Sequence, residues 1–206
     1  MTTTPLDTWS MALARLTSGR SDRSLVLHAP SGVGVTLLTR MMTAAEGAGW
    51  IAGYAEAHPD QSLRDVISQA LQLPLADLDR PTTNATTRAA LTTYATFTSP
   101  EQAHVIEAPA RDAGTGQLDL DLSILVRVIT AAQTEKAAGL ALLINTAHDL
   151  SNPELASLCS LTHMANQRRW PLLIALAGTT ELLPRLGDSK GYAERLFNYL
   201  EVETSA

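Results

Sequence analysis

Apolar residues recur at two spacings along the 206-residue chain, and segments of the two kinds alternate. Continuous apolar runs predict buried strands, which we expect at residues 24–30, 50–57, 140–145, 171–178 and 198–203. Between them, apolar residues three or four positions apart predict amphipathic helices. Strands that are apolar on both faces and separated by helices are typical of a parallel sheet covered on both sides. The pattern therefore predicts a three-layer α/β/α core around a mostly parallel five-stranded sheet.

The helical segments follow from the same spacing. We expect them at residues 5–16, from the turn after the first strand to Gly47, at 62–73, 86–97, 119–139 and 151–169, and in two short pieces around Leu182 and Leu196. The weaker middle third also contains a short apolar run at 103–108, which favours a further strand, and a polar turn at 111–117. With neither an internal repeat nor a long linker, residues 1–206 are interpreted as a single domain. An N-terminal helix occupies residues 1–20, and the core extends over residues 24–203.

Composition narrows the classes of function. The formal net charge is -6 and only two of the fifteen basic residues are lysines, which argues against a nucleic-acid partner. The longest apolar runs are too short to cross a bilayer, and residues 1–9 lack the features of an export signal. Cys159 is the only cysteine, in keeping with a reducing compartment. We therefore expect a cytoplasmic protein.

A glycine-containing turn links the first strand to the next helix. It reads Ala29-Pro30-Ser31-Gly32-Val33-Gly34-Val35-Thr36. The phosphate-binding pattern G-x-x-x-x-G-K-[ST] uses backbone N–H groups to hold phosphates, a lysine for their charge and a hydroxyl for magnesium. Gly34 and Thr36 match this pattern, whereas Ala29 replaces the first glycine and Val35 replaces the lysine. The turn alone is equally compatible with an ordinary strand-to-helix connection.

The last third of the chain carries a more specific signal. The segment "GLALLINTAHDL", residues 139–150, and the segment "AGTTELLPRLGDSKGYAERLF", residues 177–197, resemble the second half of the ATPase core in AAA+-type ATP-binding proteins of bacteria and archaea. This group is related to the origin-recognition ATPases, and the likeness runs from about Ser24 to Val202. The resemblance implies a P-loop sheet with ATP and Mg²⁺ above the strand ends. It assigns cofactor binding to Ser31, Gly32, Val33, Gly34, Val35 and Thr36, and a magnesium contact to Thr36.

The chain departs from this family at its charged positions. In the family the strand equivalent to residues 140–145 ends in Asp-Glu, where Asp helps hold magnesium and Glu orients the attacking water. Asn145 and Thr146 stand there, and neither an amide nor a hydroxyl serves as a base near neutral pH. Family members also continue into a helical lid, whereas this sequence stops at Ala206. The resemblance thus implies a degenerate domain that lacks the lid and has no catalytic residues.

Other residues near these positions allow two interpretations. His148 and Asp149 follow the strand end; we favour a structural role for Asp149, with Ser151 and Glu154 forming a capping box. Arg195 occupies a place where the family often carries an arginine that touches a neighbour's nucleotide. A salt bridge of Arg195 with Glu194, Glu201 or Asp188 is an equal alternative.

The remaining histidines and the cysteine suggest no chemistry. The five histidines lack the spacing of a zinc site. We expect His28 to be a hydrogen-bonded core residue and Cys159 to pack on the apolar face of its helix.

These observations leave three functional hypotheses. The first is a degenerate ATPase domain that acts as a protein-interaction or regulatory module and binds ATP and Mg²⁺ weakly or not at all. Its partner would be an active ATPase relative or a second copy of the chain. The second is a true ATP-binding protein in which an arginine, Lys190 or a neighbouring subunit replaces the missing lysine. The third, a DNA-associated protein, rests on kinship with origin-recognition ATPases alone, and the acidic charge counts against it.

Overall fold

A computed structural model describes residues 3–77, 85–98, 117–133 and 139–203. Its centre is a five-stranded sheet in which every neighbouring pair is parallel, in the order β2-β3-β4-β1-β5. The strands are β1 (Ser24–His28), β2 (Ile51–Glu56), β3 (Leu140–Asn145), β4 (Leu172–Gly178) and β5 (Phe197–Glu201). These are the five strands expected from the sequence, with ends that differ from the expected ones by at most two residues.

The described helices also follow the sequence pattern. They are α1 (Pro5–Thr17), α2 (Val35–Gly47), α3 (Leu63–Ala76), α4 (Ala85–Thr98), α5 (Leu118–Gln133), α6 (Asn152–Arg168), α7 (Leu182–Ser189) and α8 (Ala193–Leu196), with a 3-10 turn, η4 (Ala147–Asp149), after β3. The strand expected at 103–108 and most of the turn at 111–117 lie outside the described residues.

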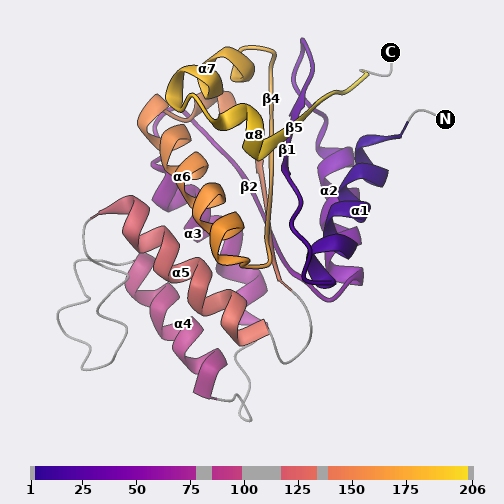
Figure 1. The fold of residues 1–206 in the computed structure, drawn as a ribbon. Coiled ribbons are helices and arrows are strands. Elements are labelled where there is room, and N and C mark those ends of the chain that lie inside the picture. Colours follow the sequence, from indigo (N-terminus) through magenta and orange to yellow (C-terminus); the bar gives the residue numbers. More distant parts are fainter. Residues whose placement is uncertain (1–2, 78–84, 99–116, 134–138, 204–206) are drawn as a thin grey trace.

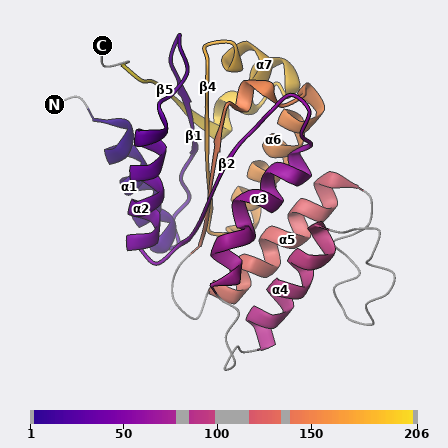
Figure 2. The same cartoon turned by 180° about the vertical axis from the view of Figure 1, so that it is seen from behind.

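The helices form two layers of different thickness on the sheet. Helices α1 and α2 cover one face, and α3 to α8 cover the other (Figure 1). The same division is visible from behind (Figure 2). Successive residues of each strand contribute to opposite cores: Leu25 and Leu27 of β1 face α1 and α2, and Val26 faces the thicker layer. Both faces of every inner strand are therefore buried, which explains the continuous apolar runs.

Trp9 of α1 joins the two helices of the thin layer. Its side chain is completely buried, and its indole Nε1 donates to the backbone oxygen of Met41 in α2 at 2.8 Å. The helix begins with a capping box in which the Thr4 hydroxyl accepts from the N–H of Asp7 and the Asp7 carboxylate accepts from the N–H of Thr4. The amphipathic N-terminal helix is thus an integral part of the domain.

A buried ion pair joins three helices of the thick layer. Arg64 of α3 lies 2.5 Å from Asp121 of α5, whose side chain is completely buried. The guanidinium also donates to the backbone oxygen of Phe97 in α4 at 2.7 Å and stacks over the Phe97 ring at 4.5 Å. Because a buried carboxylate is costly unless paired, Arg64 compensates for Asp121 and fixes α3 relative to α4 and α5.

Candidate functional site

The connections that follow β1 and β4 diverge at the carboxyl ends of these two strands. These strands are neighbours, but β1 leads to α2 on one face of the sheet and β4 leads to α7 on the other. Two neighbouring strands whose connections leave toward opposite faces form a topological switch point. Open parallel sheets bind their ligands outside the carboxyl ends of the strands at such a switch point. The β1–α2 loop (residues 29–34) therefore occupies the position where a ligand site is expected from the fold alone.

The β1–α2 loop places the N-terminus of α2 at the carboxyl end of β1. Ala29 continues β1 by donating its N–H to the Gly178 oxygen of β4 at 3.3 Å. The N–H of Gly32 closes a tight turn onto the Ala29 oxygen at 3.0 Å, and Gly32 has a φ of 83°, which favours glycine. Gly34 is the N-cap of α2 and no side chain caps it. The Leu37 N–H donates to the Gly34 oxygen at 3.2 Å, so the N–H groups of Val35 and Thr36 are the ones left to an external acceptor, as in an anion site.

The side chains of this loop carry no positive charge. Val35, at the position of the expected lysine, is 54% exposed and adds an apolar surface to the helix start. Ser31 and Thr36 are exposed, whereas Val33 is buried against the thin layer. The six predicted binding residues thus span the end of the loop and the first two positions of α2, and their contribution to an anion is limited to backbone dipoles and two hydroxyls.

β3 ends at Asn145, and Thr146 follows it. Neither side chain can act as a general base. Asn145 is 8% exposed, and by strand alternation its side chain lies on the α2 face of the sheet. The Thr146 hydroxyl donates to the backbone oxygen of Ala57 at 2.6 Å, and the Ala57 N–H donates to the Asn145 oxygen at 3.0 Å. Thr146 therefore holds the ends of β2 and β3 together, a structural role that the sequence did not reveal.

The structure also shows a carboxylate near Asn145 that the sequence reasoning missed. Glu56, the last residue of β2, is the register partner of Asn145, so the two side chains extend on the same face. Strands of a sheet are about 4.8 Å apart, which places β2 roughly 14 Å from β1 across three spacings. At that separation Glu56 is poorly placed to share a metal ion with Thr36.

His148 connects η4 to the end of β4. Its Nδ1 accepts from the N–H of Thr179 at 3.4 Å, and its Nε2 lies 3.9 Å from the Asp149 carboxylate. A Cβ at Gly178 would come within 2.8 Å of the His148 Nδ1, so only glycine allows this close approach. His148 and Asp149 thus contact each other and β4, and neither reaches the β1–α2 loop through a hydrogen bond in the described part of the chain.

Arg185 of α7 anchors the segment that contains His148. Its guanidinium donates to the backbone oxygens of His148 and Leu150, the latter at 2.5 Å, and to Asn152 Oδ1 at 2.9 and 3.1 Å. No local pattern in the sequence marks Arg185, because its partners lie more than thirty positions away. As these donors are engaged, Arg185 is a poor replacement for the missing lysine.

The interpretation of His28 as a hydrogen-bonded core residue is wrong. His28 is half-buried at the end of β1, and its buried Nδ1 has no hydrogen-bond partner. Its register partner on β4 is Gly178, which has no side chain, and no hydrogen bond joins it to Glu201, its register partner on β5, in the described part of the chain. The hydroxyl of Thr179, which follows Gly178, is likewise buried without a partner. Two unpartnered polar atoms therefore belong to residues at the adjoining ends of β1 and β4.

Arg195 lies at the opposite edge of the sheet. It belongs to α8, which directly precedes β5, and the start of β5 is in register with the start of β1. Arg195 is exposed, and no salt bridge to Glu194, Glu201 or Asp188 occurs among the described residues. It lines a shallow polar pocket of about 520 Å³ together with Ser21, Asp22, Arg23, His163, Asn166 and Gln167. Arg195 cannot serve the loop of its own chain from there.

Two structural predictions for α6 are confirmed. The Glu154 carboxylate accepts from the N–H and the hydroxyl of Ser151 at 2.9 and 2.7 Å, which is the predicted capping box. Glu154 also accepts from the N–H of Leu63 at 2.6 Å, so one carboxylate caps both α6 and α3. Cys159 is completely buried, and burial raises the pKa of its thiol.

Lys190 does not face the loop either. It follows α7 and influences the Cys159 thiol of α6 electrostatically, which places it in the thick helical layer opposite α2. Arg185 and Lys190 thus both belong to the other face of the sheet.

Comparison of the chain with protein-family models, with curated proteins and with solved structures found no match. The likeness to AAA+-type ATPases accordingly stays a prediction. No helix among the described ranges has the length and apolar character needed to span a membrane. Within the same ranges, no three His, Cys, Asp or Glu residues cluster as metal ligands.

The site fits the expected cofactor in part. The free N–H groups at the start of α2 suit a phosphate, and the Thr36 hydroxyl is exposed beside them. Magnesium prefers carboxylate and water oxygens. On that face β3, two strands from β1, ends in the neutral Asn145, and Glu56 of β2 is one strand farther away. The described residues therefore fit an anion and do not fit a tightly held magnesium ion.

Proposed function

We propose that this chain is a catalytically degenerate AAA+-like P-loop ATPase domain that acts as a protein-interaction or regulatory module. One observation carries the proposal: Val35, Asn145 and Thr146 occupy the three positions where the resemblance expects Lys, Asp and Glu. Thr146, in addition, uses its hydroxyl to hold Ala57. The single cysteine supports a cytoplasmic location for this module.

The loss of charge removes the means of catalysis. Phosphoryl transfer depends mainly on positioning and on electrostatic stabilisation. If each missing group supplied ~3 kcal/mol, their joint loss would lower the rate by about six powers of ten, which is a ceiling because such losses are not additive. Efficient hydrolysis of ATP is therefore not expected.

Weak binding of a nucleotide is compatible with the same geometry. The backbone donors of α2 remain, and the loss of one charge-assisted contact costs about 1.5 to 3 kcal/mol, or one to two powers of ten in affinity. We expect a dissociation constant for ATP in the millimolar range or weaker.

Arg195 supports the interaction role. An exposed arginine without a salt bridge in the described part of the chain is available to a partner, and arginine is enriched where protein interfaces are strongest. Because Arg195 and the β1–α2 loop lie at opposite edges of the sheet, one protomer could present Arg195 to the loop edge of another. The partner would be an active ATPase relative or a second copy of this chain.

A second candidate is a functional ATP-binding protein that uses a different phosphate contact. The unpartnered His28 Nδ1 and Thr179 Oγ1 at the ends of β1 and β4 favour it, because buried polar atoms normally have partners. A bound ligand would supply hydrogen-bond partners for these two atoms.

Two experiments test the proposal. Titration of the purified protein with ATP and magnesium distinguishes the candidates: we expect no saturation below the millimolar range, and micromolar binding would favour the second candidate. Capture of partners from native lysate is then compared for the wild type, Arg195→Ala and the control Arg168→Ala. The proposal predicts a partner retained by the control and lost by Arg195→Ala. Absence of any partner together with tight ATP binding would overturn it.

A further inference from the structure

The outer edge of β2 is open among the residues that the structure describes. β2 is the first strand of the sheet and pairs only with β3. The N–H groups of Ile51 and Ala57 donate to Gly139 and Asn145 at 2.9 and 3.0 Å. Because residues of a parallel strand alternate in direction, Ala52, Tyr54 and Glu56 turn their backbone N–H and C=O groups away from β3. These groups form a template for one more strand.

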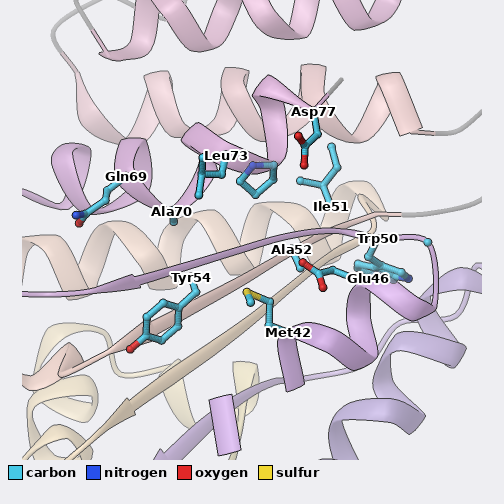
Figure 3. Close-up of a pocket in the computed structure, with 12 residues that line it drawn as sticks. Met42, Glu46, Trp50, Ile51, Ala52, Tyr54, Gln69, Ala70, Leu73 and Asp77 are labelled. Atoms are coloured by element: carbon cyan, nitrogen blue, oxygen red, sulfur yellow. The ribbon is translucent and has the colours of Figure 1, made fainter. Parts of the chain in front are cut away.

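A groove runs along this edge. It has a volume of about 560 Å³, lies between α2 and α3 and includes Ala52 and Tyr54, two of the residues with outward backbone groups. Figure 3 shows Met42 of α2 and Leu73 of α3 on opposite sides of β2. Leu73 is 76% exposed, so its side chain adds apolar surface to this groove. The remaining lining residues are Glu46, Gly49, Trp50, Ile51, Gln69, Ala70, Pro74 and Asp77.

Among the residues that the structure describes, the charges of the groove are of one sign. Glu46 and Asp77 lie at the Trp50 end, as Figure 3 shows, and no lysine or arginine of the described ranges lines the groove. Glu56 lies at the other end of the strand. A basic side chain on an incoming segment would therefore be attracted to either end.

We propose that this groove binds an extended segment of a partner protein, which adds to β2 as a sixth strand. The segment would place an apolar side chain between Met42 and Leu73 and a lysine or arginine beside Glu46 and Asp77. Strand addition of this kind takes its affinity from backbone hydrogen bonds and its specificity from pockets for alternate side chains. The inference rests on the interaction role proposed above and is independent of nucleotide binding, since the groove and the β1–α2 loop are separate.

The same charges disfavour a second copy of the chain as the occupant. A symmetric pair would join two β2 strands in antiparallel fashion. The Ile51 end of one strand, with Glu46 and Asp77, would then face the Glu56 end of the other. Like charges placed opposite each other destabilise such pairs.

The experiment uses a displayed library of random dodecapeptides, selected on the immobilised protein. Enriched peptides are then synthesised, and their affinities are measured for the wild type, for Ala52→Pro and for the double variant Glu46→Lys/Asp77→Lys. Proline at position 52 removes an outward N–H and leaves the ladder with β3 intact. The matched control, Glu181→Lys/Asp188→Lys, makes the same change of net charge on exposed residues outside the groove. Each variant is first shown to have a wild-type far-UV spectrum and cooperative unfolding.

We expect enriched peptides to combine alternating apolar residues with a lysine or arginine. Their affinity should fall about tenfold or more in the groove double variant and stay unchanged in the control. Amide exchange of Ala52, Tyr54 and Glu56 should slow in the complex. The inference is overturned if no peptide is enriched, or if enriched peptides bind the double variant as well as the wild type. It is also overturned if the protein self-associates through an edge that Ala52→Pro blocks.

A failure here is distinguishable from failure of the proposed function. A partner captured through Arg195 and insensitive to all groove variants would overturn the groove and leave the interaction role standing.

Discussion

The hydroxyl of Thr146 donates to the backbone oxygen of Ala57 at 2.6 Å, so the side chain that follows β3 joins the ends of β2 and β3. Thr146 has a φ of 48°, an unusual value for a β-branched residue. Non-glycine residues in such conformations are retained when the surrounding structure requires them. The position at which the resemblance expects a base has thus become part of the framework.

Removal of the Thr146 hydroxyl should lower stability. Thr146→Ala leaves the Ala57 oxygen without this donor, and we expect a loss of about 1 to 3 kcal/mol in the free energy of unfolding. Thr146→Ser keeps the hydroxyl and should stay close to the wild type. Urea denaturation of the three proteins measures the difference, and equal midpoints would show that the bond contributes nothing.

Breaking the Arg64–Asp121 pair should be among the most damaging changes in the thick layer. Arg64→Met leaves the buried Asp121 carboxylate without its guanidinium, at a cost of about 3 to 5 kcal/mol. The double variant Arg64→Met/Asp121→Leu removes both charges, so it should be less destabilised than the sum of the two single variants. Thermal unfolding of the double-mutant cycle tests this coupling, and strict additivity would contradict it.

Arg185 should control the mobility of the segment after β3. Arg185→Lys keeps the charge and loses the planar fork that reaches Leu150 and Asn152 together. We expect faster amide exchange in residues 147–152 and little change in β1. Asn152→Ala, the control, removes one acceptor and should have a smaller effect. Unchanged exchange in Arg185→Lys would mean that the segment is held by other contacts.

Stability should fall at alkaline pH. Burial raises the pKa of Cys159 above its ordinary value of 9.0 and that of Tyr94 above 10.0. Above the ordinary pKa the unfolded chain loses these protons first, so the native state binds more protons and the free energy of unfolding decreases as pH rises. The contribution is complete below about pH 8 and is lost as pH passes through the folded-state values.

Cys159→Ala provides the check on this pH dependence. The difference in unfolding free energy between about pH 8 and about pH 10 should be smaller in the variant than in the wild type. An identical difference would show that the thiol does not contribute.

The fold was readable from the sequence because its strands are apolar on both faces and its helices are amphipathic. Runs such as Leu140–Asn145 have few alternatives to a buried parallel strand, and the Ser151–Glu154 box depends on residues three positions apart. Strand order was not readable, because it depends on contacts between distant segments.

The candidate site was predictable only where its residues are local. Residues Gly32 to Thr36 are contiguous, so the sequence predicted a strand-to-helix connection there, which the structure shows. Arg185, Glu56 and Thr179 act through partners on other elements, and no spacing signals them. A histidine on a buried strand normally finds a partner, but the buried Nδ1 of His28 has none, and the sequence does not show which residues of the neighbouring strands lie beside it.

The central claim is that the charged groups for phosphoryl transfer have been replaced by neutral ones on a scaffold that keeps its shape. Magnesium-dependent hydrolysis of ATP by the purified wild-type protein, followed by phosphate release, tests it most directly. We predict release at the background rate of a protein-free control. Turnover near the ordinary range of enzymes, about 1 per second or faster, would contradict the claim.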